Sequence, residues 1–239
     1  MQQQVKSSLA SGNMIVDTSV FKLNGSSDLS IKTIGNQNNM VIVVDNFLEN
    51  PFGFVEFLKL IPMQRSEEWF PGNQLKLNYY FPEFCPFMDG IAKVYDVTGG
   101  EKRFYYNQYD GNLEVLRRSN HPHIDPDISL AFNLYLNVHD EIDGESGTAF
   151  YRHKKSGLEY RPDFKAKYRY KYFDISTDED PMEKVYYSPI REDDNFEMYH
   201  LEEQQFNRLV IYEGHLFHNL FVEEGRYMNN TRNSFAMFL

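Results

Sequence analysis

The C-terminal half of the chain contains short runs of β-branched and aromatic residues that alternate with turn-forming residues. The runs are RFYYNQY (103–109), SLAFNLYLN (129–137), GTAFYRH (147–153), NRLVIYE (207–213) and SFAMFL (234–239). Runs of this length and composition predict strands, and several strands after an upstream helical region favour a β-sandwich or jelly roll backed by helices. A chain of 239 residues suits one domain with such a mainly β fold, or two small domains, and we expect a single domain, 1–239.

The region before residue 100 is expected to supply the helices and one more central strand. Residues 40–44 (MVIVV) form a β-branched run that predicts a buried strand. A helix is expected to start at Asn50, with Pro51 in its first turn, and a second helix is expected over 83–96. The buried face of the second helix should carry Phe87, Ile91, Val94 and Tyr95. The turn-rich segment 1–35 predicts short peripheral strands.

One long segment, residues 157–205, does not match a strand of the predicted core. It is polar and rich in tyrosine, and it is longer than an ordinary connection between strands. Two interpretations remain open: a functional insertion that covers the site as a lid, or a surface excursion with one short helix. Its basic stretch KAKYRYKY (165–172) is interpreted first as a solvated face, because the acidic DEDP that follows offsets its charge.

The charge and cysteine content limit the classes of partner. A formal net charge of −11 argues against a nucleic acid, whose phosphates require a basic surface. The single cysteine, Cys85, excludes a disulfide framework and fits a reducing compartment. No apolar run is long enough to cross a bilayer, and the N-terminal MQQQVKSSLASGN lacks the apolar part of a signal peptide. We therefore expect no nucleic acid, no membrane and a cytoplasmic location, and the oligomeric state stays open.

Three potential metal ligands fall at the ends of predicted strands. His123 and Asp125 occur in HPHID, before an apolar run, and His218 occurs in EGHLFHN, after the run that ends at Tyr212. His-x-Asp with a distant His is the two-histidine, one-carboxylate set of non-haem Fe(II) oxygenases, which leaves one face of an octahedral iron open. His-x-Asp alone is a weak signal for a metal site. The signal is stronger here because the motif lies at the end of a predicted strand, where a sheet can hold the ligands in place.

An arginine opens the last predicted strand. Arg232, in TRNSFAMFL, could bind a carboxylate of a co-substrate with its planar guanidinium. Arg226, in the turn EEGRYMNN, is a rival for this role, and an ordinary ion pair with a surface acid is the alternative role for Arg232. Arg232 is preferred because it begins an apolar strand and is followed by Ser234.

In these features the chain resembles the 2-oxoglutarate- and Fe(II)-dependent dioxygenases, on the prolyl-4-hydroxylase-like side of that superfamily. The resemblance covers residues 100–239 well and 40–100 loosely. YNQYD followed by HPHID is similar to the family's tyrosine-containing strand that leads into His-x-Asp, and NRLVIYEGHLFHN is similar to the strand that delivers the distal histidine. TRNSF carries the family's Arg-x-Ser, and GESGTAFYRH has Ser-Gly-Thr where Gly-Gly is commoner. The set most resembles bacterial and phage members with a GTxFYRH segment.

The resemblance implies a double-stranded β-helix, the jelly roll of cupin-like proteins, with helices packed on one sheet. It implies Fe(II) on His123, Asp125 and His218, and it favours these histidines over the neighbouring His121 and His215. It further implies that 2-oxoglutarate chelates the iron while its distal carboxylate reaches a guanidinium on the last strand.

Four residues are expected to hold that co-substrate. Arg232 binds the distal carboxylate with help from Ser234 in the pattern of the family, and Tyr109 and Tyr135 are pocket candidates whose phenol groups can form hydrogen bonds. Packing in the core is the alternative role for either tyrosine.

The chemistry implied is oxidation of 2-oxoglutarate by O2 to succinate and CO2, with hydroxylation of an amino-acid-like, peptidyl or small-metabolite substrate. A function of a different class also stays open, because a fold does not guarantee an activity. The chain could be a non-enzymatic jelly-roll binding or assembly protein, with or without a bound metal. The complete ligand set together with Arg232 favours the enzyme, since a scaffold needs neither.

Overall fold

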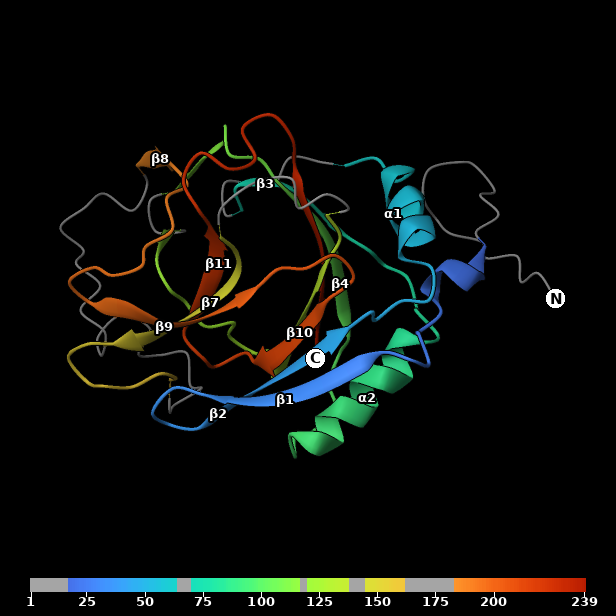
Figure 1. The fold of residues 1–239 in the computed structure, drawn as a ribbon, viewed down its shortest axis with the longest axis horizontal. Coiled ribbons are helices and arrows are strands. Elements are labelled where there is room, and N and C mark those ends of the chain that lie inside the picture. Colours follow the sequence, from blue (N-terminus) through green and yellow to red (C-terminus); the bar gives the residue numbers. More distant parts are fainter. Residues whose placement is uncertain (1–16, 64–69, 117–119, 138–144, 162–182) are drawn as a thin grey trace.

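A computed structural model of the chain describes residues 17–63, 70–116, 120–137, 145–161 and 183–239 (Figure 1). Its helices are η1 (Thr18–Phe21, a 3-10 helix), α1 (Pro51–Lys59) and α2 (Phe84–Val94). The first six strands are β1 (Asp28–Ile34), β2 (Asn39–Asp45), β3 (Gly72–Lys76), β4 (Arg103–Tyr109), β5 (Glu114–Leu116) and β6 (Leu130–Tyr135). The remaining strands are β7 (Ser146–His153), β8 (Lys184–Tyr186), β9 (Phe196–Glu203), β10 (Leu209–Glu213), β11 (His218–Val222) and β12 (Arg232–Phe238).

Seven strands form the larger sheet, in the order β1-β2-β10-β6-β12-β4-β3, with antiparallel neighbours. The strand predicted over 40–44 is confirmed as β2, and the runs predicted near residues 103, 129, 207 and 234 are confirmed as β4, β6, β10 and β12. Strands β6, β10 and β12 are buried along nearly their whole length. The sequences of β6 and β10 are almost continuously apolar, and β12 is apolar from Phe235 on, because both faces of this part of the sheet are covered.

The smaller sheet, in the order β11-β7-β9, faces the larger one. A fourth segment joins it beside β11 through an isolated antiparallel bridge between His123 and His218. The two sheets touch in the interior, where the Tyr135 hydroxyl on β6 lies 2.7 Å from the Thr148 hydroxyl on β7. Strands β10, β6, β12 and β4 thus face four segments of the smaller sheet, which is the arrangement of a double-stranded β-helix. The predicted fold class, mainly β with flanking helices, is confirmed.

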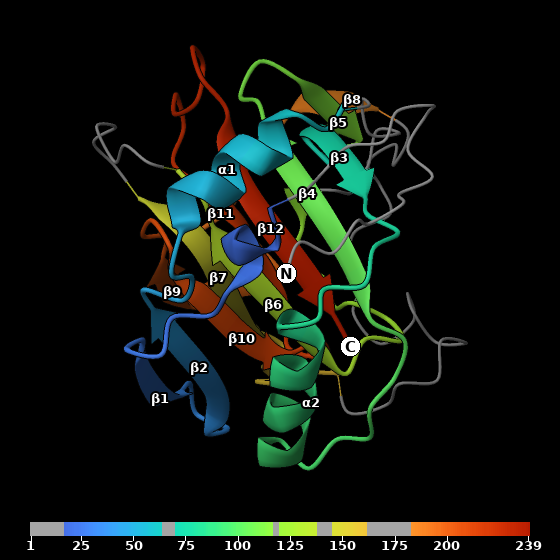
Figure 2. The ribbon, with the colours of Figure 1, turned by 90° about the vertical axis from the view of Figure 1, so that its right-hand side faces the viewer.

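Both helices pack on the face of the larger sheet that points away from the smaller sheet (Figure 2). Helix α1 begins where the sequence predicts, because the Asn50 side chain accepts a hydrogen bond from the Gly53 amide at 2.9 Å and Pro51 is the first helical residue. Aromatic rings fill the layer beneath it, with Phe54 and Phe235 at 5.1 Å between centroids. In the ranges described, neither helix has the length and apolar character needed to cross a membrane.

Helix α2 buries most of the face predicted for it, because Ile91 and Tyr95 are buried and Phe87 packs against the core. Phe84, Met88 and Ile91 are buried, whereas Val94 is 54% exposed. The prediction was wrong for Val94, which is the last residue of the helix and lies at the margin of its buried face. The spacing of apolar residues thus gave the correct element and most of its buried face.

The segment 157–205 is divided by the structure. Residues 162–182, including the basic stretch 165–172, lie outside the described residues. Strand β8 pairs with β5, and β9 pairs with β7 as an edge of the smaller sheet. The expectation that the whole segment stands apart from the core is therefore wrong for Phe196–Glu203. This strand is largely half-buried, which explains why its sequence is polar and does not resemble the buried runs.

The N-terminal segment contributes more than the periphery of the molecule. Residues 1–16 lie outside the described part of the chain. Strand β1 is the edge of the larger sheet, as expected for a peripheral strand. The residue Phe21, however, is fully buried, with its ring 5.1 Å from the Phe57 ring and 5.2 Å from the Phe81 ring. Residues 18–21 therefore complete the aromatic layer under α1.

A buried carboxylate ties the turn between β1 and β2 to the end of β7. Glu159 is fully buried and accepts hydrogen bonds from the amides of Asn36 and Gln37, at 2.8 and 3.0 Å, and from the Asn39 side chain at 2.9 Å. Arg152, on β7, donates to the same carboxylate from Nε at 2.9 Å and from Nη2 at 2.6 Å. These hydrogen bonds and the ion pair with Arg152 compensate the negative charge of Glu159, which would otherwise be costly to bury.

Replacement of Glu159 should therefore destabilise the fold. We expect Glu159→Ala to lower the free energy of unfolding by about 3–5 kcal/mol, because Arg152 and the amide donors lose their acceptor. Glu197→Ala is the control, because it removes the other carboxylate that pairs with Arg152. The Glu197 side chain is 41% exposed, so its loss should lower the free energy of unfolding by about 1 kcal/mol or less. Urea unfolding measures both, and equal losses would contradict the role of Glu159.

Candidate metal centre

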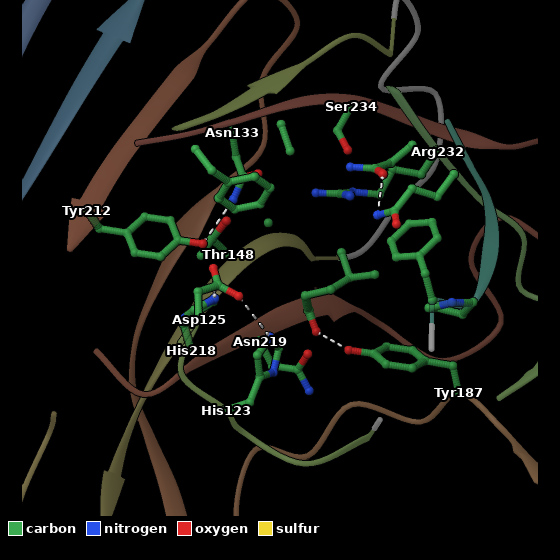
Figure 3. Close-up of a pocket in the computed structure, with 18 residues that line it drawn as sticks. His123, Asp125, Asn133, Thr148, Tyr187, Tyr212, His218, Asn219, Arg232 and Ser234 are labelled. Carbon is green, nitrogen blue, oxygen red and sulfur yellow. Dashed lines mark hydrogen bonds and ion pairs between the residues drawn. The ribbon is translucent and has the colours of Figure 1, made fainter. Parts of the chain in front are cut away.

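A pocket of about 260 Å³ lies between the two sheets (Figure 3). The larger sheet lines it with residues of β3, β4, β6, β10 and β12, and the smaller sheet with residues of β7 and β11. His123, Asp125 and His218 gather at one side of the pocket, and Arg232 and Ser234 lie at another side. The interior of the jelly roll thus brings together the residues that the sequence analysis singled out.

Backbone hydrogen bonds hold the two halves of the His-Asp-His cluster together. The amide of His123 donates to the His218 carbonyl at 2.9 Å, and the amide of His218 donates to the His123 carbonyl at 2.9 Å. The Asp125 amide donates to the Gly214 carbonyl at 2.8 Å. A Cβ atom on Gly214 would lie 2.4 Å from the Ile128 carbonyl oxygen, so this close crossing of the two loops requires glycine.

The three side chains converge to the size of a metal site. One potential ligand atom from each of His123, Asp125 and His218 lies within 4.8 Å of the other two. His218 Nε2 is 3.4 Å from Asp125 Oδ2, and His123 Nε2 is 4.0 Å from Asp125 Oδ1. His218 Nδ1 lies 2.9 Å from the Leu216 carbonyl oxygen, which requires a proton on Nδ1 and leaves Nε2 as the lone pair for a metal.

The electrostatic environment favours the protonation states that bind a metal. Desolvation and the nearby His218 imidazole lower the pKa of His123 to about 4, so its ring is neutral at physiological pH. Burial opposes ionisation of Asp125, but the two imidazoles outweigh it and keep the pKa of this carboxyl below its ordinary value. Metal ligation requires a neutral imidazole and an ionised carboxylate, which are the forms favoured for His123 and Asp125.

The competing histidines point elsewhere. His121 Nδ1 lies 3.6 Å from Asp193 Oδ2, and His215 Nε2 lies 3.9 Å from Glu213 Oε2. In the part of the chain that the structure describes, His123, Asp125 and His218 are the one group of this kind whose ligand atoms come together. The geometry therefore agrees with the choice of His123 over His121 and of His218 over His215.

Arg232 enters the pocket from the start of β12 and is 4% exposed. Its Nε donates to Gln204 Oε1 at 2.7 Å, and its guanidinium lies 5.2 Å from the centroid of the Tyr135 ring. Across the described ranges, Arg232 forms no ion pair with a carboxylate. The rival Arg226 does not line the pocket and lies over the Tyr227 ring. A buried cation without a counter-ion makes this side of the pocket suited to an anion.

The two tyrosines expected in the pocket lie behind its wall. Neither Tyr109 nor Tyr135 is among the lining residues, which corrects the expectation that their phenol groups face the pocket. The Tyr135 hydroxyl is held by Thr148, and Tyr109 packs on Tyr187 with ring centroids 5.8 Å apart. Burial, partly offset by Arg232, raises the pKa of Tyr109 to about 12. Core packing, the alternative role for these residues, is what the structure shows.

Other lining residues were not found from the sequence. Asn133 Nδ2 donates to the Tyr212 hydroxyl at 3.1 Å, and the Tyr212 ring lies 4.8 Å from the His218 ring. The alternation of β10 could have indicated Tyr212, since it shares the inner face with Val210. No local signal marks Tyr187, which follows β8 and donates to the Leu220 carbonyl.

The fold and the site define a jelly-roll protein with a two-histidine, one-carboxylate cluster and a buried arginine in the same pocket. The chain belongs to a family of unknown function (DUF6445), whose model matches residues 26–233. A search of curated proteins gives no match to the chain.

Solved structures with similar folds include three prolyl hydroxylases. A prolyl-4-hydroxylase from Pseudomonas putida aligns with a TM-score of 0.43 and 12% identity over 78% of this chain and 82% of that one. A prolyl 4-hydroxylase from Phytophthora capsici aligns with a TM-score of 0.43 and 11% identity, over 83% of this chain and 57% of that one. A prolyl hydroxylase from Trichoplax adhaerens, in complex with a hypoxia inducible factor peptide fragment, aligns with a TM-score of 0.41 and 11% identity over 84% of each chain. Similarity at this level bears on neither the activity nor the ligands of this chain.

The cluster geometry makes a prediction about metal binding. We expect His218→Ala and Asp125→Ala each to weaken binding of a divalent metal such as Co(II) by more than about a hundredfold, because each removes one of three converging ligands. His215→Ala is the matched control and should leave the affinity unchanged. Titration calorimetry measures the affinity, and circular dichroism checks the fold. Loss of binding in His215→Ala with binding retained in His218→Ala would refute the assignment.

Proposed function

We propose that the protein is an Fe(II)- and 2-oxoglutarate-dependent dioxygenase that hydroxylates an amino-acid-like, peptidyl or small-metabolite substrate. The observation that carries the proposal is the presence, in one pocket, of the His-Asp-His cluster and of a buried arginine that has no carboxylate partner among the described residues. A metal site alone would suit many functions. The additional cation suits a co-substrate with a chelating end and a distant carboxylate, which is the chemistry of 2-oxoglutarate.

The residues present fit these two groups. Two imidazoles and one carboxylate are the donors of non-haem Fe(II) sites, and a set of three leaves coordination positions for other ligands. The charge of Arg232, which no carboxylate among the described residues compensates, supports a co-substrate carboxylate on the side of the pocket away from the His-Asp-His cluster. When bound, the iron supplies the activation of O2 that is coupled to oxidation of 2-oxoglutarate to succinate and CO2.

The side chains of the chain would bind and orient the reactants. His123, Asp125 and His218 would hold the metal, and the Leu216 carbonyl keeps the His218 ring in the tautomer that presents Nε2. Arg232 would bind the distal carboxylate through its terminal nitrogens. The Ser234 hydroxyl, on the same side of β12, could donate a further hydrogen bond to it.

The proposal is tested first by spectroscopy and product analysis. Anaerobic addition of Fe(II) and 2-oxoglutarate should give a weak visible charge-transfer band, and addition of O2 with a panel of amino acids, peptides and metabolites should give succinate. Zn(II) in place of Fe(II) is the control and should give no band. A non-enzymatic binding protein would show neither the band nor succinate, and that result would refute the proposal.

The contribution of Arg232 is tested separately. Arg232→Ala should weaken 2-oxoglutarate binding by about 2–5 kcal/mol, seen as a large rise in its apparent KM, because the distal carboxylate loses its partner in a buried site. Arg232→Lys should recover little of this loss, because an ammonium lacks the planar fork. The affinity for Fe(II) should stay unchanged in both variants. An unchanged KM in Arg232→Ala, with a raised KM in Arg226→Ala, would move the role to Arg226.

A further inference from the structure

We propose that Gln204 determines the charge of the co-substrate that this pocket accepts. Its neutral amide orients Arg232 without compensating it, and so keeps the guanidinium charge available for the distal carboxylate of a dicarboxylate. The inference rests on the proposed function and deepens it, because it assigns the selection of the co-substrate to a residue that has no contact with the metal cluster.

The Gln204 side chain is held in one orientation by its contacts. It directly follows β9, where its backbone amide donates to the Ser146 carbonyl at 2.8 Å. Its Oε1 accepts from Arg232 Nε at 2.7 Å and from the Ser146 hydroxyl at 3.0 Å, and its Nε2 donates to the Tyr227 hydroxyl. The two donors on one end and the phenol on the other end place the amide oxygen against the arginine.

The guanidinium of Arg232 is in turn oriented from two directions. Gln204 accepts the hydrogen bond from Arg232 Nε, and the central carbon of the guanidinium lies 5.2 Å from the centroid of the Tyr135 ring. The terminal nitrogens form no hydrogen bond with a described residue, and the side chain lines the pocket (Figure 3). A guanidinium fixed in this way can present both terminal nitrogens to one carboxylate with little further loss of side-chain freedom.

The buried acid of β9, Glu202, does not provide a counter-ion for Arg232. Glu202 lies two residues before Gln204 and is 2% exposed. Its carboxylate is bound by Lys32 at 2.7 Å and by Arg208 at 3.5 Å, so its charge is compensated by other cations. The hydrogen-bond acceptor that reaches Arg232 is the neutral amide of Gln204. A carboxylate in the same position would form an internal ion pair and would compete with an incoming anion.

The test changes this one charge and measures binding directly. Gln204→Glu replaces the amide with a carboxylate of nearly the same shape, and Gln204→Leu removes the hydrogen bond without adding charge. Gln205→Glu is the matched control, because it makes the same chemical change at the adjacent, exposed residue. Each protein is loaded with Zn(II), a redox-inert substitute for iron, and titrated calorimetrically with 2-oxoglutarate and with oxalate. Oxalate can chelate a metal but has no distal carboxylate.

We expect Gln204→Glu to weaken 2-oxoglutarate binding on the order of a hundredfold, while oxalate and Zn(II) bind as in the parent protein. Gln204→Leu should weaken 2-oxoglutarate by about tenfold, and Gln205→Glu should change nothing. A general structural defect would weaken both anions alike, and that result would overturn the inference, as would an unchanged affinity for 2-oxoglutarate. If Gln204→Glu does not fold, Gln204→Leu decides by the same comparison. Failure of the parent protein to bind 2-oxoglutarate would instead refute the proposed function itself.

Discussion

The reciprocal backbone hydrogen bonds between His123 and His218 are the interaction on which the site depends. They join segments that are far apart in the sequence and add the fourth segment to the smaller sheet. Residues directly opposite each other in an antiparallel pair have neighbouring side chains, so this pairing places the two imidazoles together. Asp125 follows two residues after His123, and the bond between its amide and Gly214 holds its carboxylate within reach of both rings. The spacing His-x-Asp therefore becomes a candidate metal site only through a backbone contact.

The distribution of charge inside the jelly roll is the second constraint. The chain is acidic overall, with a formal net charge of −11. Its described carboxylates in the interior have partners, as in Glu159 with Arg152 and Glu202 with Lys32. Arg232 differs, because its side-chain partners are a neutral amide and an aromatic ring. The pocket thus keeps the positive charge of Arg232 apart from the candidate metal ligands in a molecule of negative net charge, and the proposed binding of a small dianion rests on this separation.

Much of the fold could be predicted because local composition and burial agree in the central strands. Strands such as β6 and β10 are apolar or aromatic along nearly their whole length, and helix α1 carries its start signal in Asn50 and Pro51. The prediction failed where burial depends on a distant partner. Strand β9 is polar because it lies at a sheet edge, and Val94 is exposed because it lies at the margin of the buried face of α2. Neither fact is encoded in the periodicity of the segment itself.

The sequence by itself determined the strand-rich architecture and the identity of the candidate ligands, because β-branched runs and the His-x-Asp spacing are local signals. It also singled out Arg232 over Arg226, through the position of Arg232 at the head of a strand. Only the tertiary structure decided which side chains face the pocket. It placed Tyr109 and Tyr135 behind the wall, brought Tyr212 into the lining of the pocket and brought Gln204 against Arg232. The physical reason is that orientation toward a cavity depends on the register and packing of strands from distant parts of the chain, which no local pattern specifies.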